Sequence, residues 1–256
     1  MVDFEIEKTK RIATVLDNVQ LHEAAHAFMR ASTHPKYSYN FSWLGRPIIQ
    51  YPQDIVAIQE LIWSIKPDLI IETGIAHGGS LILSASILAL LDMYEAIEAG
   101  ENIGSKASLR KVLGIDIDIR AHNRAAIEAH PLASWIQMIQ GSSVAPEIIA
   151  QVHSVANDFS RVLLCLDSNH THDHVLAELN AYAPLVAVGS YCVVFDTIIE
   201  SMPAEMYPDR AWGPGNSPKS ALTEYLISHS EFEIDKLIDQ QLLISVASGG
   251  YLRRVR

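Results

Sequence analysis

The stretch DLIIETGIAHGGSLILSASILALL, residues 68–91, decides the fold of this chain. It begins with a short, almost continuously apolar run, which is typical of a strand buried on both faces of a parallel sheet. A glycine-rich turn follows, and then an apolar segment of helical length. The order of strand, glycine turn and helix predicts the first βα unit of an open parallel sheet.

The same unit recurs along the chain. The five predicted strands are 68–74, 112–118, 135–141, 162–167 and 190–196, and the predicted helices between them are 79–97, 121–130, 144–157 and 172–183. This alternation indicates βαβ units with right-handed crossovers. The sequence therefore predicts an α/β fold with a Rossmann-like, mostly parallel, twisted sheet.

The two ends of the chain differ from this repeat. The first forty residues have an amphipathic helical pattern, so we expect a helical extension at 1–50 and a main domain at 51–256. Near the other end, QQLLISVA (240–247) and GYLRRV (250–255) are joined by Ser248 and two glycines. This pattern predicts an antiparallel C-terminal hairpin.

Composition restricts the partners. The chain has 256 residues and a formal net charge of -11, which disfavours binding to nucleic acid or to anionic membranes. Cys165 and Cys192 lie inside apolar runs and are expected to be buried free thiols. The first twenty residues contain no apolar signal segment, and no apolar stretch reaches the length of a membrane span without a charge. We therefore expect a cytoplasmic protein with no nucleic-acid partner and no membrane insertion.

Polar residues stand where the first three strands end, which is where open parallel sheets bind ligands. The glycine turn follows the first strand, an acid follows the second, and small hydroxyl residues follow the third. Glycines allow close backbone approach, and an acid accepts hydrogen bonds from ribose hydroxyls, so this line of sites suits a nucleoside. The candidate cofactor-binding residues are Glu72, Gly74, Gly78, Ser80, Asp116, Asp118, Ser142 and Ser143.

Other nucleotide and hydrolase motifs are missing. The glycine turn is neither the G-x-G-x-x-G fingerprint nor a Walker A motif, and the chain has no G-x-S-x-G elbow. The layout therefore favours an S-adenosylmethionine (SAM) methyltransferase over a dehydrogenase or an α/β-hydrolase. Ser142 or Ser143 would equally serve as the N-cap of the helix predicted from Val144.

The fourth strand leads into LDSNHTHDHVLAEL, residues 166–179. Its three histidines, His170, His172 and His174, raise the alternative of a zinc enzyme. On a helix, His170 and His174 share one face and His172 turns away. A three-histidine zinc site would therefore need irregular backbone.

Seven blocks together resemble the cephalosporin hydroxylase / rhamnosyl O-methyltransferase family, from about Trp43 to Leu226. They are WLGRPIIQYPQDI, IETGIAHGGSLILSASIL, VLGIDIDIRAHNR, IQGSS, LDSNHTHDHVLAEL, YCVVFDTIIE and WGPGNSPKSALTEYL. The resemblance implies a class I SAM-dependent methyltransferase. Related macrolide sugar O-methyltransferases use Mg²⁺, held by an aspartate after strand four and a Glu-Asp pair after strand five. A histidine three residues after the first aspartate is their general base.

By this resemblance Asp167 and Asp196 are metal ligands, and His170 is the base. Phe195 replaces the first acid of the pair, which removes one ligand and one negative charge. Magnesium commonly uses only one or two carboxylates, so weaker metal binding and a metal-free site both stay open. Glu200 is a possible substitute that the spacing does not select.

The resemblance predicts an O-methyltransferase acting on a hydroxyl of a sugar or natural product, assisted by a divalent metal, in a homo-oligomer. The alternative is a catalytically weak or silent SAM-binding partner subunit of a cephalosporin-hydroxylase-like system, which Phe195 favours. The loop at 212–222 is expected to cover the site, with Lys219 facing the acceptor or a carboxylate. Trp43, Arg46 and Gln50 are expected to line the acceptor pocket or an interface.

Overall fold

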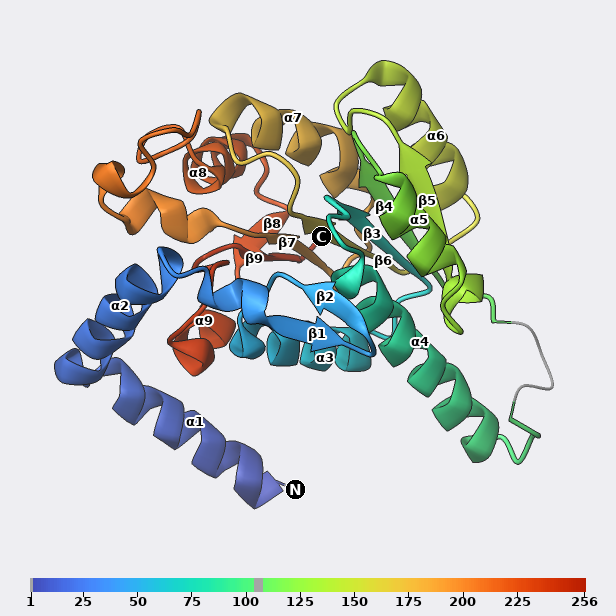
Figure 1. Ribbon diagram of the computed structural model, residues 1–256. Helices are drawn as coiled ribbons and strands as arrows, with labels where there is room; N and C mark the ends of the chain where they lie inside the picture. Colours follow the sequence, from blue (N-terminus) through green and yellow to red (C-terminus); the bar gives the residue numbers. More distant parts are fainter. Residues whose placement is uncertain (1, 104–107) are drawn as a thin grey trace.

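The computed structural model describes residues 2–103 and 108–256, and its centre is one mixed sheet (Figure 1). The strand order is β5-β4-β3-β6-β7-β9-β8. The first five strands along this order are parallel, as predicted. They are β3 (Leu69–Thr73), β4 (Lys111–Asp116), β5 (Ile136–Gln140), β6 (Val162–Leu166) and β7 (Tyr191–Val194).

The chain reverses its direction of growth at β3. From β3 it proceeds through β4 to β5 on one side, and then returns to β6 and β7 on the other. Thr73 is level with both Ile115 and Leu166, so the carboxyl ends of these strands lie together. Such a switch point is where doubly wound sheets bind their ligands.

Helices cover both faces of the sheet. One core cluster joins α3 (Pro52–Ile65) and α4 (Gly79–Glu98) to the sheet, and α5 (Ala121–Glu128) adds Ile127 to it. The other cluster joins α6 (Pro146–Ala156), α7 (His172–Tyr182) and α8 (Pro218–Ser228) to the opposite face. Successive strand residues alternate between the two clusters, with Ile70 in one and Ile71 in the other. Burial on both faces explains the continuously apolar runs in the sequence.

Helix α4 is the one described helix long and apolar enough to cross a membrane. Its residues Leu81, Leu88 and Leu91 are fully buried, and all three belong to the core cluster on one face of the sheet. This packing is typical of a core helix, as the sequence predicted.

The N-terminal region begins with two helices, α1 (Val2–Leu16) and α2 (Val19–Thr33). Helix α1 lies at the periphery of the molecule, where it contacts the segment at residues 236–242 (Figure 1). A short turn then leads to an antiparallel pair, β1 (Phe41–Trp43) and β2 (Arg46–Ile48), which the sequence did not predict. This pair lies beside the start of α4 and the glycine turn.

The predicted C-terminal hairpin is confirmed in its antiparallel pairing, but its first strand is not the predicted segment 240–247. The last strand, β9 (Tyr251–Arg254), lies antiparallel between β7 and β8 (Phe232–Ile234). Helix α9 (Lys236–Leu242) takes up the first residues of the segment predicted as a strand. Asp235 caps this helix by accepting a hydrogen bond from the backbone N–H of Leu237. Ser245 and Val246 then donate to the buried carboxylate of Asp54, so this segment docks on α3 instead of joining the sheet.

Candidate active site

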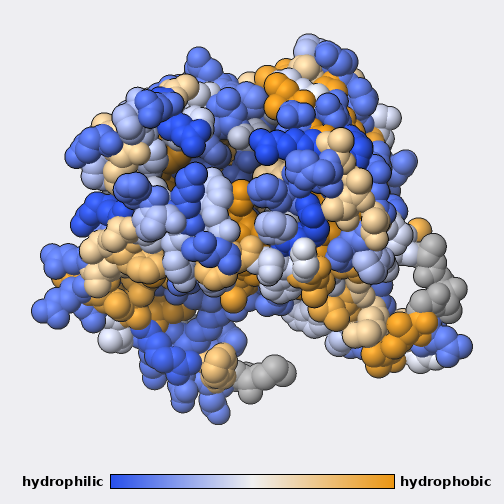
Figure 2. All heavy atoms as spheres, viewed as in Figure 1, coloured by the Kyte–Doolittle hydropathy of each residue, from blue (hydrophilic) through white to orange (hydrophobic). Residues whose placement is uncertain are grey.

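A cavity of about 920 Å³ opens beyond the carboxyl ends of the central strands. Its walls come from α2, the turn after it, β2, the glycine turn and the segment from Asp196 to Trp212. On the face shown in Figure 2, mostly hydrophilic side chains surround a hollowed centre. The cavity therefore lies at the switch point where the fold favours ligand binding.

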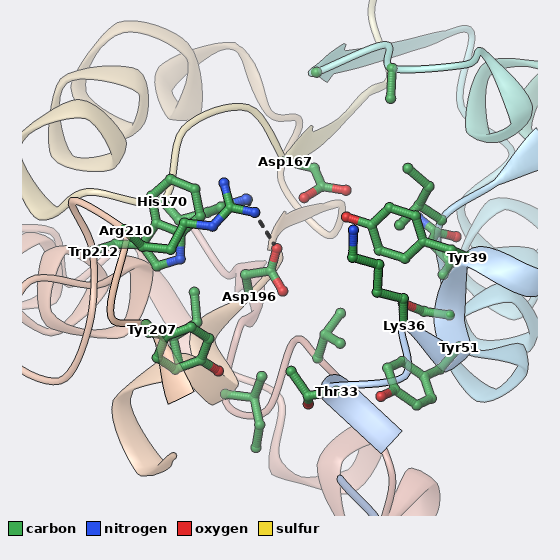
Figure 3. Close-up of a pocket in the computed structure, with 18 of the residues that line it drawn as sticks. Thr33, Lys36, Tyr39, Tyr51, Asp167, His170, Asp196, Tyr207, Arg210 and Trp212 are labelled. Atoms are coloured by element: carbon green, nitrogen blue, oxygen red, sulfur yellow. Dashed lines mark ion pairs between the residues drawn. The ribbon is translucent and has the colours of Figure 1, made fainter. Parts of the chain in front are cut away.

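Three predicted site residues meet in this cavity (Figure 3). Asp167 follows β6, Asp196 follows β7, and His170 lies on the loop that leads to α7. One ligand atom from each lies within 4.8 Å of the others, and His170 Nε2 is 3.3 Å from Asp196 Oδ2. Within residues 2–103 and 108–256, this is the one set of three such side chains close enough to share a metal ion.

The turn after β7 explains why Asp196 faces the cavity and Phe195 does not. Phe195 is buried in the core cluster that includes Ile75 and Tyr251. Asp196 then adopts a left-handed conformation with φ of 56°, which turns the chain at once. This conformation is unfavourable for a residue with a Cβ, and such strain is often found at functional sites. The position of the expected first acid is therefore in the apolar core, where an ionised side chain would be costly.

Negative charge accumulates at Asp167. Its pKa is raised well above the usual range, first by burial at the strand end and then by the charge of Asp196, with smaller contributions from Glu72, Asp54 and Glu178. Each of these causes raises the pKa, so none of them compensates the negative charge. A hard divalent cation would supply that compensation, and two carboxylates are enough for Mg²⁺ when waters complete its shell.

Aromatic and cationic side chains enclose His170. The ring of Trp212 meets the imidazole edge to face at a centroid distance of 4.8 Å. The guanidinium of Arg210 lies 4.9 Å from the centre of the Trp212 ring. Both residues line the cavity, so the segment before α8 packs over the histidine.

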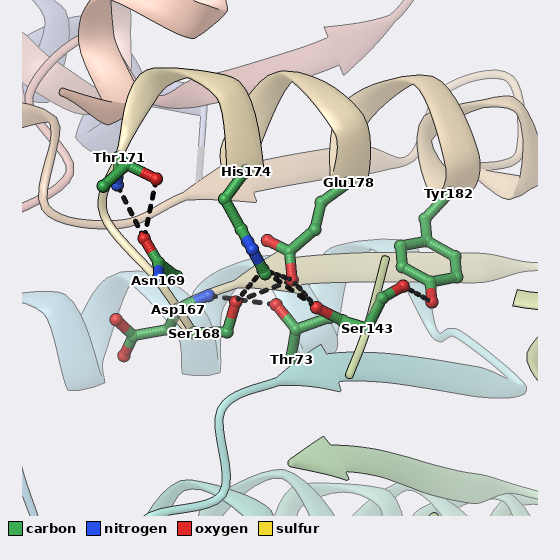
Figure 4. Close-up of polar contacts among 9 residues, drawn as sticks. All are labelled: Thr73, Ser143, Asp167, Ser168, Asn169, Thr171, His174, Glu178 and Tyr182. Carbon is green, nitrogen blue, oxygen red and sulfur yellow. Dashed lines mark hydrogen bonds and ion pairs between the residues drawn. The ribbon is translucent and has the colours of Figure 1, made fainter. Parts of the chain in front are cut away.

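The three histidines of the 170–174 run have three different sets of partners. His172 contacts α8, with Nδ1 at 2.8 Å from Ser220 Oγ and Nε2 at 3.2 Å from Glu224. His174 lies 3.4 Å from Glu178 on its own helix (Figure 4). A three-histidine zinc site therefore has no support in the described residues.

Glu200 and Lys219 do not join the group formed by Asp167, His170 and Asp196. Glu200 accepts hydrogen bonds from Gly215 N and Ser217 Oγ, so it fixes the turn before α8. Lys219 donates to the backbone carbonyl of Gly249 at 3.1 Å and lies outside the cavity lining. Burial lowers the pKa of Lys219, and the negative charge of the nearby Asp239 opposes that shift. The alternative in which Lys219 faces a carboxylate is therefore confirmed, whereas Glu200 is engaged by the turn before α8.

Asp116 shapes the glycine turn. Its Oδ2 accepts hydrogen bonds from Ile75 N (2.8 Å) and Ala76 N (3.2 Å), and its Oδ1 accepts one from Asp118 N (3.0 Å). A carboxylate offers about four acceptor positions, so roughly one remains for a ligand. Asp116 lines the cavity, whereas the side chain of Asp118 is exposed elsewhere.

The glycines bring protein backbone together. A Cβ on Gly74 would lie 2.0 Å from the carbonyl oxygen of Asp167, and a Cβ on Gly79 would lie 2.2 Å from that of Pro47. Gly74 therefore lets the glycine turn contact the loop that carries Asp167. Gly74 and Gly79 also line the cavity, whereas Gly78 packs against Ile127 outside it.

The remaining cofactor candidates divide between the cavity and the interior. Ser80 lines the cavity and donates a hydrogen bond to Glu72, a buried carboxyl whose pKa burial raises to about 7. Ser143 is buried and donates to Glu178 instead of facing the cavity. Neither Ser142 nor Ser143 is the helix cap, because α6 starts at Pro146 with Ala145 as its N-cap.

Arg46 and Trp43 position the wall beside the glycine turn. The guanidinium of Arg46 donates to the carbonyl of His77 and to Asn123 Oδ1, and Trp43 Nε1 donates to Ser86. These two side chains therefore hold β1 and β2 in place, whereas Gln50 lines the cavity as expected.

Sequence reasoning missed the contribution of α2 and the turn after it. Thr33, Lys36 and Tyr39 line the cavity across from Asp167 and Asp196 (Figure 3). Their segment has only an amphipathic helical pattern followed by turn residues, which carries no signal of a binding surface.

Comparison with known proteins gives concordant matches. The model of the family described as Rhamnosyl O-methyltransferase/CmcI matches residues 35–255. A rhamnosyl O-methyltransferase of Mycobacterium leprae is 27% identical over 227 residues, covering 86% of this chain and 88% of its own length. One from Mycobacterium tuberculosis (strain ATCC 25618 / H37Rv) is 30% identical over 215 residues, covering 79% of this chain and 77% of its own.

Solved structures share the fold. A CmcI structure with Mg and SAM matches with a TM-score of 0.53 at 19% identity, covering 85% of this chain and 78% of its own. An apo structure of CmcI matches with a TM-score of 0.52, also at 19% identity, covering 85% and 77%.

Proposed function

The chain belongs to the rhamnosyl O-methyltransferase/CmcI family, a family of SAM-dependent methyltransferases, and we propose that it transfers a methyl group from SAM to a hydroxyl of a sugar or natural product. The observation that carries this proposal is the convergence of Asp167, His170 and Asp196 in one cavity with the glycine turn. In this arrangement His170 would accept a proton and Asp167 and Asp196 would bind a metal ion, while the glycine turn would bind the nucleoside.

The glycine turn and Asp116 would bind SAM. Gly74, Ser80 and Asp116 line the cavity, and the CmcI structure of the same fold contains SAM. Asp116 would accept a ribose hydroxyl through its remaining acceptor position. Glu72 and Gly78 would support the turn from beneath. Asp118 and Ser142 stay candidates for the nucleoside end, and Ser143 would act by holding the loop after β5, because its hydroxyl is engaged by Glu178.

The donor set fits a divalent metal. Asp167 and Asp196 are two carboxylates with ligand atoms that lie, together with one of His170, within 4.8 Å of one another. Burial and the charge of Asp196 raise the pKa of Asp167, so a cation would be favourable there. A bound Mg²⁺ would lower the pKa of an acceptor hydroxyl. The core position of Phe195 leaves these two carboxylates in place, and Mg²⁺ commonly needs no more.

His170 would take the proton of the acceptor hydroxyl. Imidazole is the side chain suited to proton transfer at neutral pH, and its Nε2 faces the acidic pair. Asp196 and Trp212 hold the ring on two sides. Alignment of the hydroxyl oxygen with the sulfonium methyl would then supply much of the rate, because methyl transfer is an in-line displacement.

Charge and composition support the remaining proposals. The net charge of -11 disfavours nucleic acid, and the cavity of about 920 Å³ has a volume that suits a small hydroxyl-bearing acceptor. We also propose that the protein works in the cytoplasm as a homo-oligomer.

The first experiment is titration calorimetry with S-adenosylhomocysteine (SAH), with and without Mg²⁺, followed by a methyl-transfer assay on glycosides with vicinal hydroxyls. We expect SAH binding and metal-stimulated turnover. Absence of SAH binding would defeat the proposal, and binding without turnover on any diol would favour a silent subunit.

A matched pair of histidine variants tests the assignment of the base. His170→Ala should lose at least about a hundredfold in turnover, the contribution typical of general base catalysis, and keep its SAH affinity. His172→Ala is the control, because His172 contacts α8 and lies outside the cavity lining. Equal losses in both variants would contradict the role of His170.

A further inference from the structure

Glu178 is a buried carboxylate for which the proposed reaction has no direct use. It lies on α7 and is fully buried. Its Oε1 accepts hydrogen bonds from Ser143 Oγ at 2.5 Å and Ser168 Oγ at 2.6 Å (Figure 4). Its Oε2 is buried with no hydrogen-bond partner in the described residues. Burying such a group is costly, so its contacts call for an explanation.

His174 completes the cluster one helical turn earlier. Its Nε2 lies 3.4 Å from Glu178 Oε1, 3.1 Å from Ser143 Oγ and 3.3 Å from Ser168 Oγ. We call Ser143, Ser168, His174 and Glu178 the α7 cluster. It joins three segments of the chain: helix α7, the loop after β5 and the loop after β6.

One of these loops carries the proposed metal ligand and base. Ser168 follows Asp167 directly and precedes His170 by two residues. On its other side this loop is held by β3, because Asp167 N donates to the carbonyl of Thr73 at 3.0 Å. Ser168 therefore links this loop to the middle of α7 through its hydrogen bond to Glu178.

The other loop carries the candidate nucleoside residues. Glu178 holds the hydroxyl of Ser143, and the hydroxyl of Tyr182 donates to the Ser143 carbonyl. Helix α7 thus holds both the side chain and the backbone of this residue. A shift of the loop after β5 would be transmitted through Glu178 to Ser168.

We propose that Glu178 is a positioning residue whose hydrogen bonds to Ser143 and Ser168 couple cofactor binding to metal binding. This inference rests on the proposed function. When a nucleoside fixes the loop after β5, the α7 cluster holds the loop after β6 in the arrangement that brings Asp167 and His170 together. Each ligand then binds more tightly in the presence of the other, and the two effects are equal because coupling is reciprocal.

Calorimetry of the intact protein measures this coupling directly. Mg²⁺ affinity is determined with and without saturating SAH, and SAH affinity with and without saturating Mg²⁺. SAH is the suitable probe because its neutral sulfur does not repel the metal as the sulfonium of SAM would. For the wild type we expect mutual tightening of about 5-fold or more, the lower end of ordinary allosteric coupling.

Two variants remove the link at different points. Ser168→Ala detaches the metal loop from Glu178, and the coupling in this variant should fall toward 1. Glu178→Gln keeps the side-chain volume and replaces the charge-assisted hydrogen bonds from Ser143 and Ser168 by weaker neutral ones, so the coupling should fall partway toward 1. In both variants, SAH affinity without metal should stay within about twofold. Thr171→Val is the matched control, because its hydroxyl bonds only to Asn169 on the same loop in the described residues and should leave the coupling unchanged.

The outcomes separate this inference from the proposed function. Wild-type protein that binds SAH and Mg²⁺ independently overturns the coupling and leaves the methyltransferase assignment intact. Coupling that survives in both Ser168→Ala and Glu178→Gln also overturns it. Wild-type protein that does not bind SAH defeats both. Circular dichroism checks folding, and if Ser168→Ala unfolds, Glu178→Gln decides the matter.

Discussion

Replacing Glu72 by glutamine should stabilise the protein at alkaline pH. Glu72 is buried beneath the glycine turn, and burial raises its pKa from 4.5 to about 7 despite the hydrogen bond from Ser80. At 1.36 kcal/mol per pH unit, ionisation of this carboxyl destabilises the folded state by about 3 kcal/mol. Because the folded-state pKa is raised, this cost is absent below pH 4.5 and complete above about pH 7. Glutamine has no such cost and still accepts the hydrogen bond from Ser80.

The assay is urea unfolding between about pH 4.5 and 8.5, with EDTA present so that metal binding does not contribute. Near pH 4.5 the wild type and E72Q should have similar unfolding free energies, and above pH 8 the variant should be more stable by about 3 kcal/mol. Glu60→Gln is the control, because Glu60 is exposed and its replacement should not change the pH slope. Parallel curves for the wild type and E72Q would refute the reasoning. A large loss of SAH affinity in E72Q would show instead that Glu72 contacts the cofactor.

Three further variants test other parts of the structure. Asp196→Asn removes one of the two proposed metal carboxylates. Loss of an outer-shell partner alone lowers metal affinity about 10- to 100-fold, so Mg²⁺ affinity measured by calorimetry should fall at least about tenfold; unchanged affinity would mean that Asp196 is not a ligand. Arg46→Lys loses the planar fork that spans His77 and Asn123, so SAH affinity should fall about tenfold, with a normal circular dichroism spectrum; full affinity would separate β2 from cofactor binding. Burial raises the pKa of Asp54 from 3.8 to about 6, so ionisation of Asp54 should add about 3 kcal/mol to the fall of the wild-type unfolding free energy as pH rises through this range, and D54N should lack that part of the fall in urea titrations.

The parts of the fold that depend on local pattern could be predicted from the sequence. The runs that became β3, β4 and β6 are apolar at nearly every position, because both faces of those strands are buried. The stretch at 240–247 is also apolar, but its structure depends on a distant residue. Ser245 and Val246 bond to Asp54, which is almost two hundred positions earlier in the chain. A hydrophobic pattern contains no information about such a contact.

The site residues likewise divide into those that strand ends and the family pattern could predict and those that depend on tertiary contacts. Asp167, His170 and Asp196 were expected together because strand ends meet at one edge of the sheet and the family pattern selects these positions, and the structure brings them within reach of one ion. Ser143 was expected at the cavity because it follows a strand end. The sequence does not show that Glu178, one helical turn beyond His174, would engage the hydroxyl of Ser143.

The hydrogen bonds of the buried acids identify the position that requires a ligand. Asp54 accepts from Ser245, Glu72 from Ser80, and Glu178 from Ser143 and Ser168, so each of these carboxyl groups has at least one hydrogen-bond donor within the protein. The carboxylate of Asp167 accepts no side-chain or backbone hydrogen bond from the described residues, although burial and the charge of Asp196 raise its pKa well above the usual range. A carboxylate that is partly removed from water, faces a cavity and has acidic neighbours is stabilised either by a proton or by a cation. Proton uptake would leave His170 beside a neutral acid, whereas a divalent cation would draw both carboxylates and the acceptor hydroxyl to one point. The charge distribution of this chain therefore favours metal binding, even with phenylalanine at position 195.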